Sequence, residues 1–297
     1  MPAGSARRRR QVAVAYALMA PAGALVLGIL AYPVAWEIWA SLTDFSSRAE
    51  GAPAFVGLAN YARLLGDAWF WKALATTLGY LALTTGAKLV LGVGVALLLA
   101  RPSRLRALVF LAVFLPWAYP GGITVIAWYW MLNPPLITSY SVFMGNVKHA
   151  VDGVLGAGAW AFLSVMLFNV WRGGSFTAVF LLAGLNAIPM ELFDYARLES
   201  RSAWQRFRAV TLPLLAPYMA LAVFLSFTTA FADLGNVWML TGGRIIFPVV
   251  GTYAYWLAVK SGQLAEAATW TLSLVPLLAL GLVVLFRWFD PREETGA

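Results

Sequence analysis

Residues able to do chemistry are scarce in this sequence, and the usual catalytic candidates are missing. There is no cysteine, and the single histidine, His149, is better explained as a solvated loop residue than as a catalyst or metal ligand. The P-loop pattern G-x-x-x-x-G-K-[ST], the zinc-protease motif H-E-x-x-H and the nucleophile pattern G-x-S-x-G are all absent. These observations predict a chain that is not an enzyme, holds no metal ion and binds no cofactor of its own.

Two cations, Lys88 and Arg172, interrupt stretches that are otherwise apolar. A charge deep in a bilayer costs at least about 2.5 kcal/mol when it faces lipid, so each cation is expected to face protein or a water-filled cavity. Gly173 and Gly174, next to Arg172, allow a helix break or the close approach of another backbone. Structural pairing inside the protein is the alternative for both cations, and snorkelling to the interface is a further alternative for Lys88.

Charge is dense at residues 188–210, a short segment between two long apolar stretches. Glu191 and Asp194 lie near the start of a helical pattern, where the helix dipole favours carboxylates. Ser202 and Gln205 fit the capping box S-x-x-Q, which opens a second helix. The segment is therefore predicted to form two short helices joined by a turn.

Trp204 and Phe207 are three residues apart and are expected on one face of the second short helix. Exposed aromatic residues surrounded by charges suit a docking surface, because aromatic residues and arginine dominate the hot spots of protein interfaces. The alternative is a solvated loop whose aromatic rings lie at the level of the lipid headgroups. The residues alone leave both interpretations open.

The elements that position these residues follow from the composition. Hydrophobic residues make up 61% of the 297 residues and charged residues 11%, whereas soluble domains average about 25% charged residues. The chain is therefore predicted to be an all-α polytopic membrane protein, with six stretches that reach the roughly 20 apolar residues needed to cross a bilayer. The six predicted spans are 11–36, 73–100, 107–132, 155–187, 210–232 and 267–286. The apolar stretch 245–259 is too short to cross and is interpreted as re-entrant or interfacial.

The basic residues predict the orientation. Arg7–Arg10 mimic the start of a signal peptide, but the apolar stretch behind them exceeds the usual signal core of about 7–15 residues and is interpreted as an uncleaved span. With the N-terminus in the cytoplasm, 13 of the 21 lysines and arginines lie in cytoplasmic segments. The positive-inside rule therefore places both termini and residues 188–210 in the cytoplasm.

The segment 188–217, IPMELFDYARLESRSAWQRFRAVTLPLLAP, resembles the EAA loop in membrane subunits of binding-protein-dependent ABC importers. In the sugar-import branch this loop reads close to P-x-E-L-x-E-A-A-x-x-D-G-A-x-x-W-Q-x-F-x-x-I-x-L-P. The matching positions are Pro189, Glu191, Leu192, Ala196, Trp204, Gln205, Phe207, Leu212 and Pro213. The departures are Asp194 for Glu, Tyr195 for Ala, Glu199 for Asp and Ser200 for Gly. Ser200 indicates a rearranged turn, because a left-handed turn costs a non-glycine residue about 1 kcal/mol.

The resemblance extends along nearly the whole chain. YPVAWEIWASLTDFS followed by FVGLANYARLL resembles the first span and outer loop of the membrane subunits of maltose, lactose and glycerol-phosphate importers. Two further stretches, LPWAYPGGITVIAWYWMLNP and VWRGGSFTAVFLLAGLNAIP, are similar to the corresponding stretches of these subunits. The similarity of LTGGRIIFP is weaker, since a longer Gly-rich run is usual there.

The resemblance implies an ABC type I importer permease fold, with residues 1–297 as one transmembrane permease domain in a bacterial inner (plasma) membrane. It implies a sugar substrate and several partners: a second homologous permease chain, two ATPase subunits that use ATP and Mg, and an extracytoplasmic substrate-binding protein. A phosphorylated polyol such as glycerol phosphate is the alternative substrate. An ion-coupled secondary transporter is the alternative class.

In the resembled family, the EAA loop forms coupling helices that sit in a groove on the ATPase subunit. Residues 188–210 are therefore expected to be a coupling loop, with Ala196 on the docking face of its first helix. The residues that the resemblance implies in ATPase coupling are Glu191, Asp194, Ala196, Arg197, Ser200, Trp204 and Phe207.

A sugar needs partners for its hydroxyls and an apolar platform for its C–H face, and residues near the predicted spans offer both. Most of the 14 tryptophans are nevertheless expected at lipid-facing or interfacial positions. The residues expected along the substrate path are Lys88, Trp117, Tyr119, Asn169, Trp171, Arg172, Asp233 and Asn236.

The predicted orientation is testable because the chain has no cysteine of its own. In Ser202→Cys, the thiol should resist an impermeant maleimide added to intact cells and react once the membrane is permeabilised. Lys260→Cys, in a predicted outer loop, is the matched control and should react in intact cells. Labelling of Ser202→Cys from outside intact cells would contradict the cytoplasmic position of 188–210.

Overall fold

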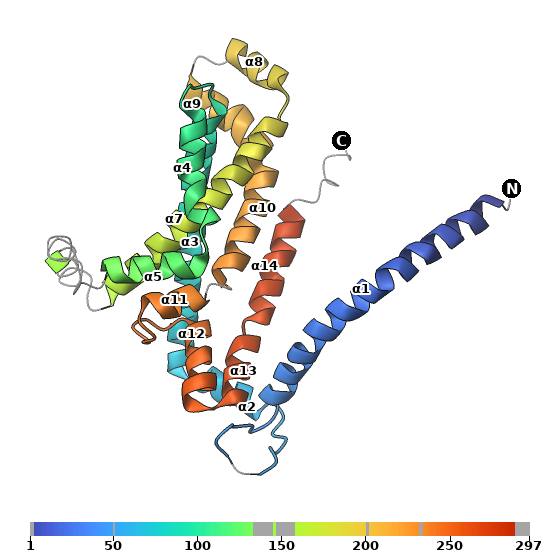
Figure 1. Cartoon of the computed structure of the whole chain (residues 1–297), viewed down its shortest axis with the longest axis vertical. Helices are drawn as coiled ribbons and strands as arrows, with labels where there is room; N and C mark the ends of the chain where they lie inside the picture. The colour runs from blue at the N-terminus through green and yellow to red at the C-terminus, as the bar shows by residue number, and fades with distance from the viewer. Residues whose placement is uncertain are drawn as a thin grey trace. The chain divides into compact units, whose positions relative to one another are not determined.

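The computed structural model describes residues 3–49, 51–132, 145–146, 158–199, 202–231 and 234–288. Within these ranges the regular structure is helical, apart from one isolated antiparallel bridge between Thr43 and Phe55. The chain divides into two compact units, of which Met1–Asp67 and Ala254–Val275 form the first. Ala68–Tyr253 and Pro276–Ala297 form the second. Figure 1 shows the helices of both units.

Several hydrogen bonds connect the helices of the first unit to one another. This unit consists of α1 (Ala3–Ser41), α2 (Ala59–Gly66), the π-helical turn η2 (Trp256–Ser261) and α13 (Leu264–Leu272). α13 packs against both α1 and α2. Asn60 fixes the end of α1, because its side-chain amide donates to the carbonyl oxygens of Ser41 and Thr43, both at 2.7 Å. The Thr271 hydroxyl of α13 donates to the Glu37 carboxylate of α1.

The second unit is built on the contact between α3 and α7. Its helices include α3 (Ala68–Ala100), α4 (Arg106–Ala118), α5 (Gly121–Leu132), α7 (Ala159–Ala187), α10 (Leu212–Phe231) and α11 (Leu234–Leu240). α10 packs against both α3 and α7, α4 packs against α7, and α11 packs against α5 and α7. Leu99, Leu181 and Leu215, each at most 1% exposed, fill the space between α3, α7 and α10. Later in the chain come α12 (Val250–Tyr255) and α14 (Val275–Trp288).

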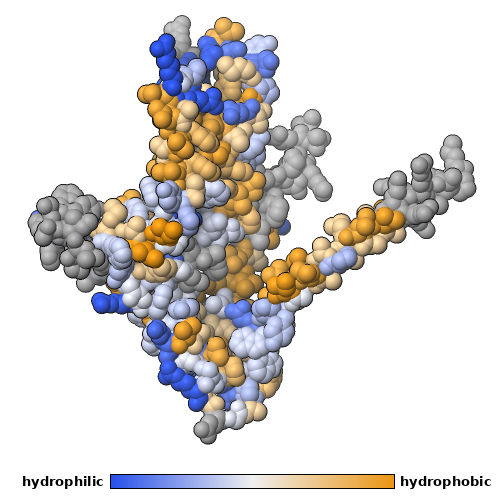
Figure 2. Space-filling model, viewed as in Figure 1, coloured by the Kyte–Doolittle hydropathy of each residue, from blue (hydrophilic) through white to orange (hydrophobic). Residues whose placement is uncertain are grey.

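Several helices of the described residues are long and apolar enough to cross a membrane. They are Val12–Ser41, Ala68–Ala100, Ala159–Ala187, Ala203–Ala230 and Leu264–Gly281, and the bent pair Arg106–Ala118 and Gly121–Leu132 brings the total to six if it forms one span. Figure 2 shows hydrophobic residues along the upright helices of the second unit and hydrophilic residues gathered at its upper end. The chain is thus an all-α, multi-pass protein, and the predicted span boundaries and the single domain over 1–297 stay predictions.

The bend between α4 and α5 has a cause in the sequence. The two helices meet at 93°, and Tyr119 between them has an extended backbone with ψ of 144°. Tyr119 directly precedes Pro120, whose ring clashes with a helical conformation of the residue before it. The stretch 107–132, expected as one continuous span, is therefore interrupted at this proline.

The segment 245–259, interpreted from the sequence as re-entrant or interfacial, becomes helical at Val250. The backbone N–H of Val250 donates to the Thr77 hydroxyl of α3 at 3.0 Å, and the side chains of Phe247 and Val249 are buried. Irregular backbone at membrane depth requires such cover by protein. The depth of this segment in the membrane stays a prediction.

α3 and α7 approach so closely that one position on α3 has no room for a side chain. A Cβ atom placed on Gly92 would lie 2.7 Å from Thr177 Cγ2 and 3.3 Å from the backbone nitrogen of Ala178. A Cβ atom on Gly94, two residues along the same helix, would meet nothing within 4 Å. The absence of a side chain at Gly92 therefore sets the distance between the two helices.

This close approach predicts different effects for two similar substitutions. Gly92→Ala should lower the free energy of unfolding by about 1–3 kcal/mol, because overpacking forces the helices apart. Gly94→Ala should leave stability unchanged or raise it by about 0.5–1 kcal/mol, because alanine loses less backbone entropy in a helix. Thermal unfolding of both purified variants in detergent measures the difference. Equal melting temperatures would show that Gly92 does not set the helix spacing.

Candidate functional site

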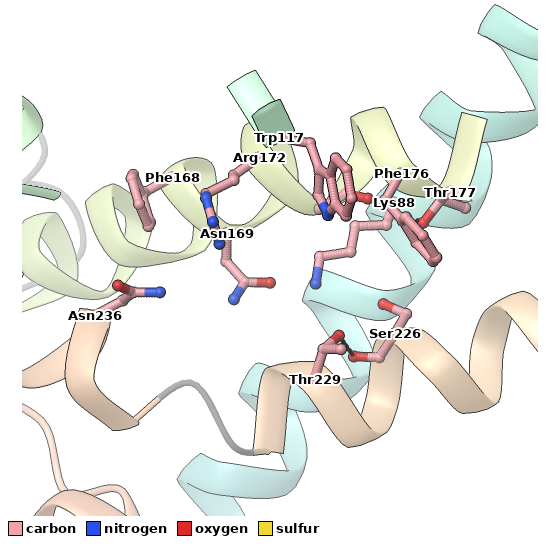
Figure 3. Close-up of a pocket in the computed structure, with 11 residues that line it drawn as sticks. Lys88, Trp117, Phe168, Asn169, Arg172, Phe176, Thr177, Ser226, Thr229 and Asn236 are labelled. Carbon is pink, nitrogen blue, oxygen red and sulfur yellow. Dashed lines mark hydrogen bonds between the residues drawn. The ribbon is translucent and has the colours of Figure 1, made fainter. Parts of the chain in front are cut away.

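A cavity of about 130 Å³ with polar and aromatic lining residues lies in the second unit, among largely apolar helices. Its lining comes from α3, α4, α7, α10 and α11, so segments far apart in the sequence meet around it (Figure 3). The lining residues are Lys88, Trp117, Phe168, Asn169, Arg172, Gly173, Phe176, Thr177, Ser226, Thr229 and Asn236. We call this cavity the central pocket.

Lys88 reaches the central pocket from α3 and is 2% exposed. Its side chain lies over Gly173 of α7, where an added Cβ atom would stand 2.5 Å from Cε and 2.8 Å from Nζ. The glycine thus leaves the space that the lysine stem occupies. Figure 3 shows the ammonium group pointing into the pocket. Lys88 therefore faces protein and the pocket, as its cost in lipid requires.

Arg172 reaches the same pocket from α7. Its guanidinium group lies beside Gly121 at the start of α5, where an added Cβ atom would stand 3.2 Å from Nη2. The Arg172 Nε atom is buried and makes no hydrogen bond to any described residue. A buried donor without a partner is costly.

Amides and hydroxyls complete the polar lining. Asn169 and Asn236 each offer donor and acceptor groups from α7 and α11. The Thr229 hydroxyl donates to the carbonyl oxygens of Leu225 at 2.8 Å and Ser226 at 3.0 Å, which leaves its oxygen to accept. The Ser226 hydroxyl is buried and has no hydrogen-bond partner among the described residues.

Aromatic rings form the apolar part of the lining. Trp117 of α4 stacks on Phe176 of α7, with ring centroids 5.6 Å apart and an angle of 29° between the rings. Phe168 packs against Trp128, with centroids 5.7 Å apart. Such fixed rings offer a flat surface to the C–H face of a polar ligand.

The structure brings together five of the eight residues expected along the substrate path. Lys88, Trp117, Asn169, Arg172 and Asn236 line the central pocket. Tyr119 and Trp171 do not line it: Tyr119 is 51% exposed beside the α4–α5 bend, and Trp171 packs against Trp128, with centroids 5.4 Å apart. Asp233 lies outside the described residues. Whether these residues contact substrate stays a prediction.

Sequence reasoning missed the polar residues of α10. Ser226 and Thr229 are three residues apart in an apolar helix, and this spacing places both on one helix face. That polar pair was the signal that could have marked α10 as part of the pocket. On α7, Asn169, Gly173 and Phe176 repeat at intervals of three or four residues, which is the same signal.

The segment 188–210 forms two short helices, as its sequence predicts. They are α8 (Met190–Glu199) and α9 (Ala203–Arg206), and the π-helical turn η1 (Phe207–Thr211) leads into α10. The Ser202 hydroxyl accepts the backbone N–H of Trp204 at 3.3 Å and so caps α9. The Trp204 and Phe207 rings stack with centroids 5.6 Å apart, as their spacing predicts.

The surface of α8 combines charge with exposed apolar side chains. Arg197 and Asp194 form an ion pair of 2.8 Å, with both side chains 60% exposed, and such a pair adds little stability. Tyr195 is 68% and Leu198 84% exposed. We call Tyr195, Leu198 and Trp204, which is 65% exposed, the apolar loop surface.

Ala196 differs from the expectation that it lies on the docking face. It is 7% exposed, so its side chain is buried within the chain. α8 contacts α9 and η1. The other described residues of α8, apart from the half-buried Phe193, are exposed. Ser200 lies outside the described residues. The coupling roles of Glu191, Asp194, Ala196, Arg197, Ser200, Trp204 and Phe207 stay predictions.

Comparison with known proteins identifies the family. Residues 88–294 match the family described as binding-protein-dependent transport system inner membrane component. The chain belongs to this family. It is a multi-pass inner-membrane component of a transport system that depends on a binding protein, and it is not an enzyme. The part of the chain that the structure describes holds no cluster of three metal-ligating residues.

Individual relatives agree with this assignment. The trehalose transport system permease protein SugA of Mycobacterium tuberculosis is 33% identical over 233 residues, which cover 77% of this chain and 73% of that protein. The trehalose/maltose transport system permease protein MalF of Thermococcus litoralis is 31% identical over 239 residues, 79% of each chain.

A solved structure shares the fold. The crystal structure of a bacterial alginate ABC transporter, in complex with an alginate pentasaccharide-bound periplasmic protein, contains a chain that superposes with a TM-score of 0.69. The match has 17% sequence identity and covers 94% of each chain. The predicted fold class, an all-α type I importer permease, is therefore confirmed.

The position of Lys88 over Gly173 predicts the effect of adding a side chain at this glycine. Gly173→Ala should push the lysine side chain aside at little cost in stability, because the displaced atoms are the end of a flexible chain. Transport should fall several-fold, while the melting temperature stays close to that of the native protein. Gly86→Ala is the control, since a Cβ atom there meets nothing within 4 Å. Equal uptake rates for both variants would show that transport does not depend on the position of the Lys88 side chain.

Proposed function

We propose that this chain forms half of the translocation path of an ATP-driven ABC importer for a saccharide. The observation that carries the proposal is the central pocket, which combines polar and aromatic side chains and is lined mainly by helices long and apolar enough to span a membrane. Its amides and hydroxyls suit the hydroxyls of a saccharide, and the stacked Trp117 and Phe176 suit its C–H face. The relatives named for trehalose and for trehalose and maltose transport support this substrate class.

A second permease chain is needed to complete the path. The central pocket has a volume of about 130 Å³, whereas pockets for small molecules usually measure about 300–1,000 Å³. One chain therefore supplies only part of the surface that a disaccharide requires. A homologous second chain, facing the same path, would supply the rest.

The energy must come from another polypeptide, because the sequence has no phosphate-binding loop. Two ATPase subunits that use ATP and Mg are proposed to bind beneath the membrane. The apolar loop surface on α8 and α9 supports this proposal, since exposed aromatic and apolar residues among charges suit docking. In this arrangement α8 and α9 are the coupling helices, and closure of the ATPases moves α7 and α10 through them.

The proposed orientation places both termini and residues 188–210 in the cytoplasm, with six spans. A substrate-binding protein then delivers the saccharide from the opposite side. The family depends on such a protein, which supports this side of the proposal.

A phosphorylated polyol stays the second candidate substrate, because Lys88 and Arg172 both line the central pocket. The family assignment leaves an ion-coupled secondary transporter without support.

The coupling proposal is tested on the most exposed residue of α8. Leu198→Glu should weaken binding of the ATPase subunits about tenfold or more, because docking would bury an unpaired charge. The permease pair should still form, since Leu198 is 84% exposed and makes little contact within the chain. Co-purification of the ATPase and substrate-stimulated ATP hydrolysis measure the effect.

Leu105→Glu is the matched control for this experiment. Leu105 is 59% exposed and lies in another predicted cytoplasmic segment, so the same change there should leave coupling intact. Native ATPase binding and native uptake in Leu198→Glu would contradict the coupling role of α8. The segment 188–210 would then be interpreted as a solvated loop.

A further inference from the structure

We propose that a second cavity of the chain, between α5, the start of α7 and the residues that follow α11, binds a sugar ring of the saccharide separately from the central pocket. This inference rests on the proposed function and adds a second site to the path. The cavity measures about 260 Å³, against about 130 Å³ for the central pocket. It belongs entirely to the second unit. We call it the second pocket.

The polar groups of the second pocket suit the hydroxyls of a sugar. The Ser164 hydroxyl of α7 donates to the carbonyl oxygen of Trp160 at 2.7 Å, and the Thr241 hydroxyl donates to that of Val237 at 2.9 Å. Both oxygens line the pocket with a lone pair left to accept. Arg244 lines it as an exposed residue and brings several N–H donors. A sugar hydroxyl both donates and accepts, so it uses both kinds of group.

Aromatic residues supply the apolar part of the same lining. Trp160 of α7 and Tyr129 of α5 both line the second pocket, and each is partly exposed. The ring of either residue offers a flat surface to the C–H face of a sugar, and the indole also has an N–H that donates. The lining thus combines the two kinds of surface that a sugar ring presents.

The turn after α11 fixes one wall of the second pocket. Gly242 and Gly243 have φ values of 64° and 71°, a conformation that glycine adopts at no steric cost. Their backbone N–H groups donate to the carbonyl oxygens of Met239 at 3.1 Å and Trp238 at 2.8 Å. A Cβ atom on Gly242 would lie 3.2 Å from the Tyr129 hydroxyl oxygen. This wall is therefore ordered by backbone hydrogen bonds, as a preorganised site requires.

One face of α7 connects the second pocket with the central pocket. Ala161 and Ser164 line the second pocket, and Phe168 and Arg172 line the central pocket. These four residues follow one another at intervals of three or four, which places them on one helix face. From Ala161 to Arg172 the helix rises about 16 Å. The two pockets are thus successive sites along the same helix.

Apolar side chains lie between the two pockets. Val165, which comes between Ser164 and Phe168 on this face of α7, is 1% exposed. It belongs to a buried cluster that includes Leu240, which lines the second pocket, and Phe168, which lines the central pocket. A sugar in the second pocket therefore occupies a site of its own, and these apolar side chains must move before it reaches the central pocket.

A part of the chain itself is the rival occupant. Residues 133–144 and 147–157, which connect α5 with α7, lie outside the described residues. Side chains from this connection could fill the second pocket in place of a sugar. The test therefore first measures whether a small reagent reaches the pocket.

The experiment exploits the absence of cysteine from the native chain. Ala161→Cys places a thiol in the second pocket, and the full chain is assembled with its partner subunits in lipid nanodiscs, without the binding protein. The rate of reaction with a small methanethiosulfonate is measured at increasing concentrations of maltose, trehalose or D-glucose, with glycerol as the control solute. At least one saccharide should slow the reaction about tenfold at saturation, whereas glycerol should not. Ala49→Cys, at an exposed position outside both pockets, should react equally with and without saccharide.

Further substitutions assign this protection to the second pocket. In the Ala161→Cys background, Trp160→Ala should raise the saccharide concentration for half-protection about tenfold or more, because an aromatic contact surface is lost. Trp160→Phe should retain most of the protection, since it keeps a ring. Trp130→Ala is the matched control, because Trp130 is an exposed residue of α5 outside both pockets, and it should leave the half-protection concentration unchanged.

Several results would overturn the proposal. An Ala161→Cys thiol that does not react at all would show that the chain itself fills the pocket. Equal protection by glycerol, no protection by any of the three saccharides, or unchanged protection in Trp160→Ala would also contradict the second site. If ATP-driven saccharide uptake is observed alongside any of these results, the proposed function stands and only this inference fails. Absence of ATP-driven uptake of any saccharide would contradict the proposed function itself.

Discussion

A charged side chain inside a membrane has to be covered by protein, and in this chain α3 and α7 provide that cover. Lys88 lies between them with 2% of its surface exposed. The helices approach closely enough at Gly92 to exclude a side chain, and Gly173 leaves the space that the lysine occupies. α4 and α10 then pack on this pair and bring Trp117, Ser226 and Thr229 to the same cavity. The contact between α3 and α7 thus determines where the polar groups of the second unit can meet.

Much of this arrangement follows from the sequence because hydrocarbon imposes simple rules on a chain. Long apolar stretches must be helices, and charges within them must face inward, so the involvement of Lys88 and Arg172 in an internal site was predictable. The cap that Ser202 places on α9 and the stacking of Trp204 on Phe207 were also predictable, since both depend on residues less than one turn apart.

Other features depend on packing between distant segments, which local patterns do not encode. Tyr119 was expected in the path, and the backbone turn at Pro120 leaves it exposed and outside the lining of the central pocket. Its contact with substrate stays a prediction. Ala196 was expected to face a partner, but its side chain is buried within its own chain. Ser226 and Thr229 were missed, because nothing in the sequence of α10 alone says which of its faces meets α7.

The positions of Lys88 and Arg172 beside glycines of neighbouring helices have a mechanical consequence. Lys88 belongs to α3 and lies over a glycine of α7, and Arg172 belongs to α7 and lies beside a glycine of α5. The place of each charge therefore depends on the register between two helices. A helix turn rises 5.4 Å, and a slide of a fraction of that distance would carry the ammonium group off its glycine. Any rearrangement that shifts α3 along α7 therefore changes the electric field inside the cavity, without any side chain having to change its protonation.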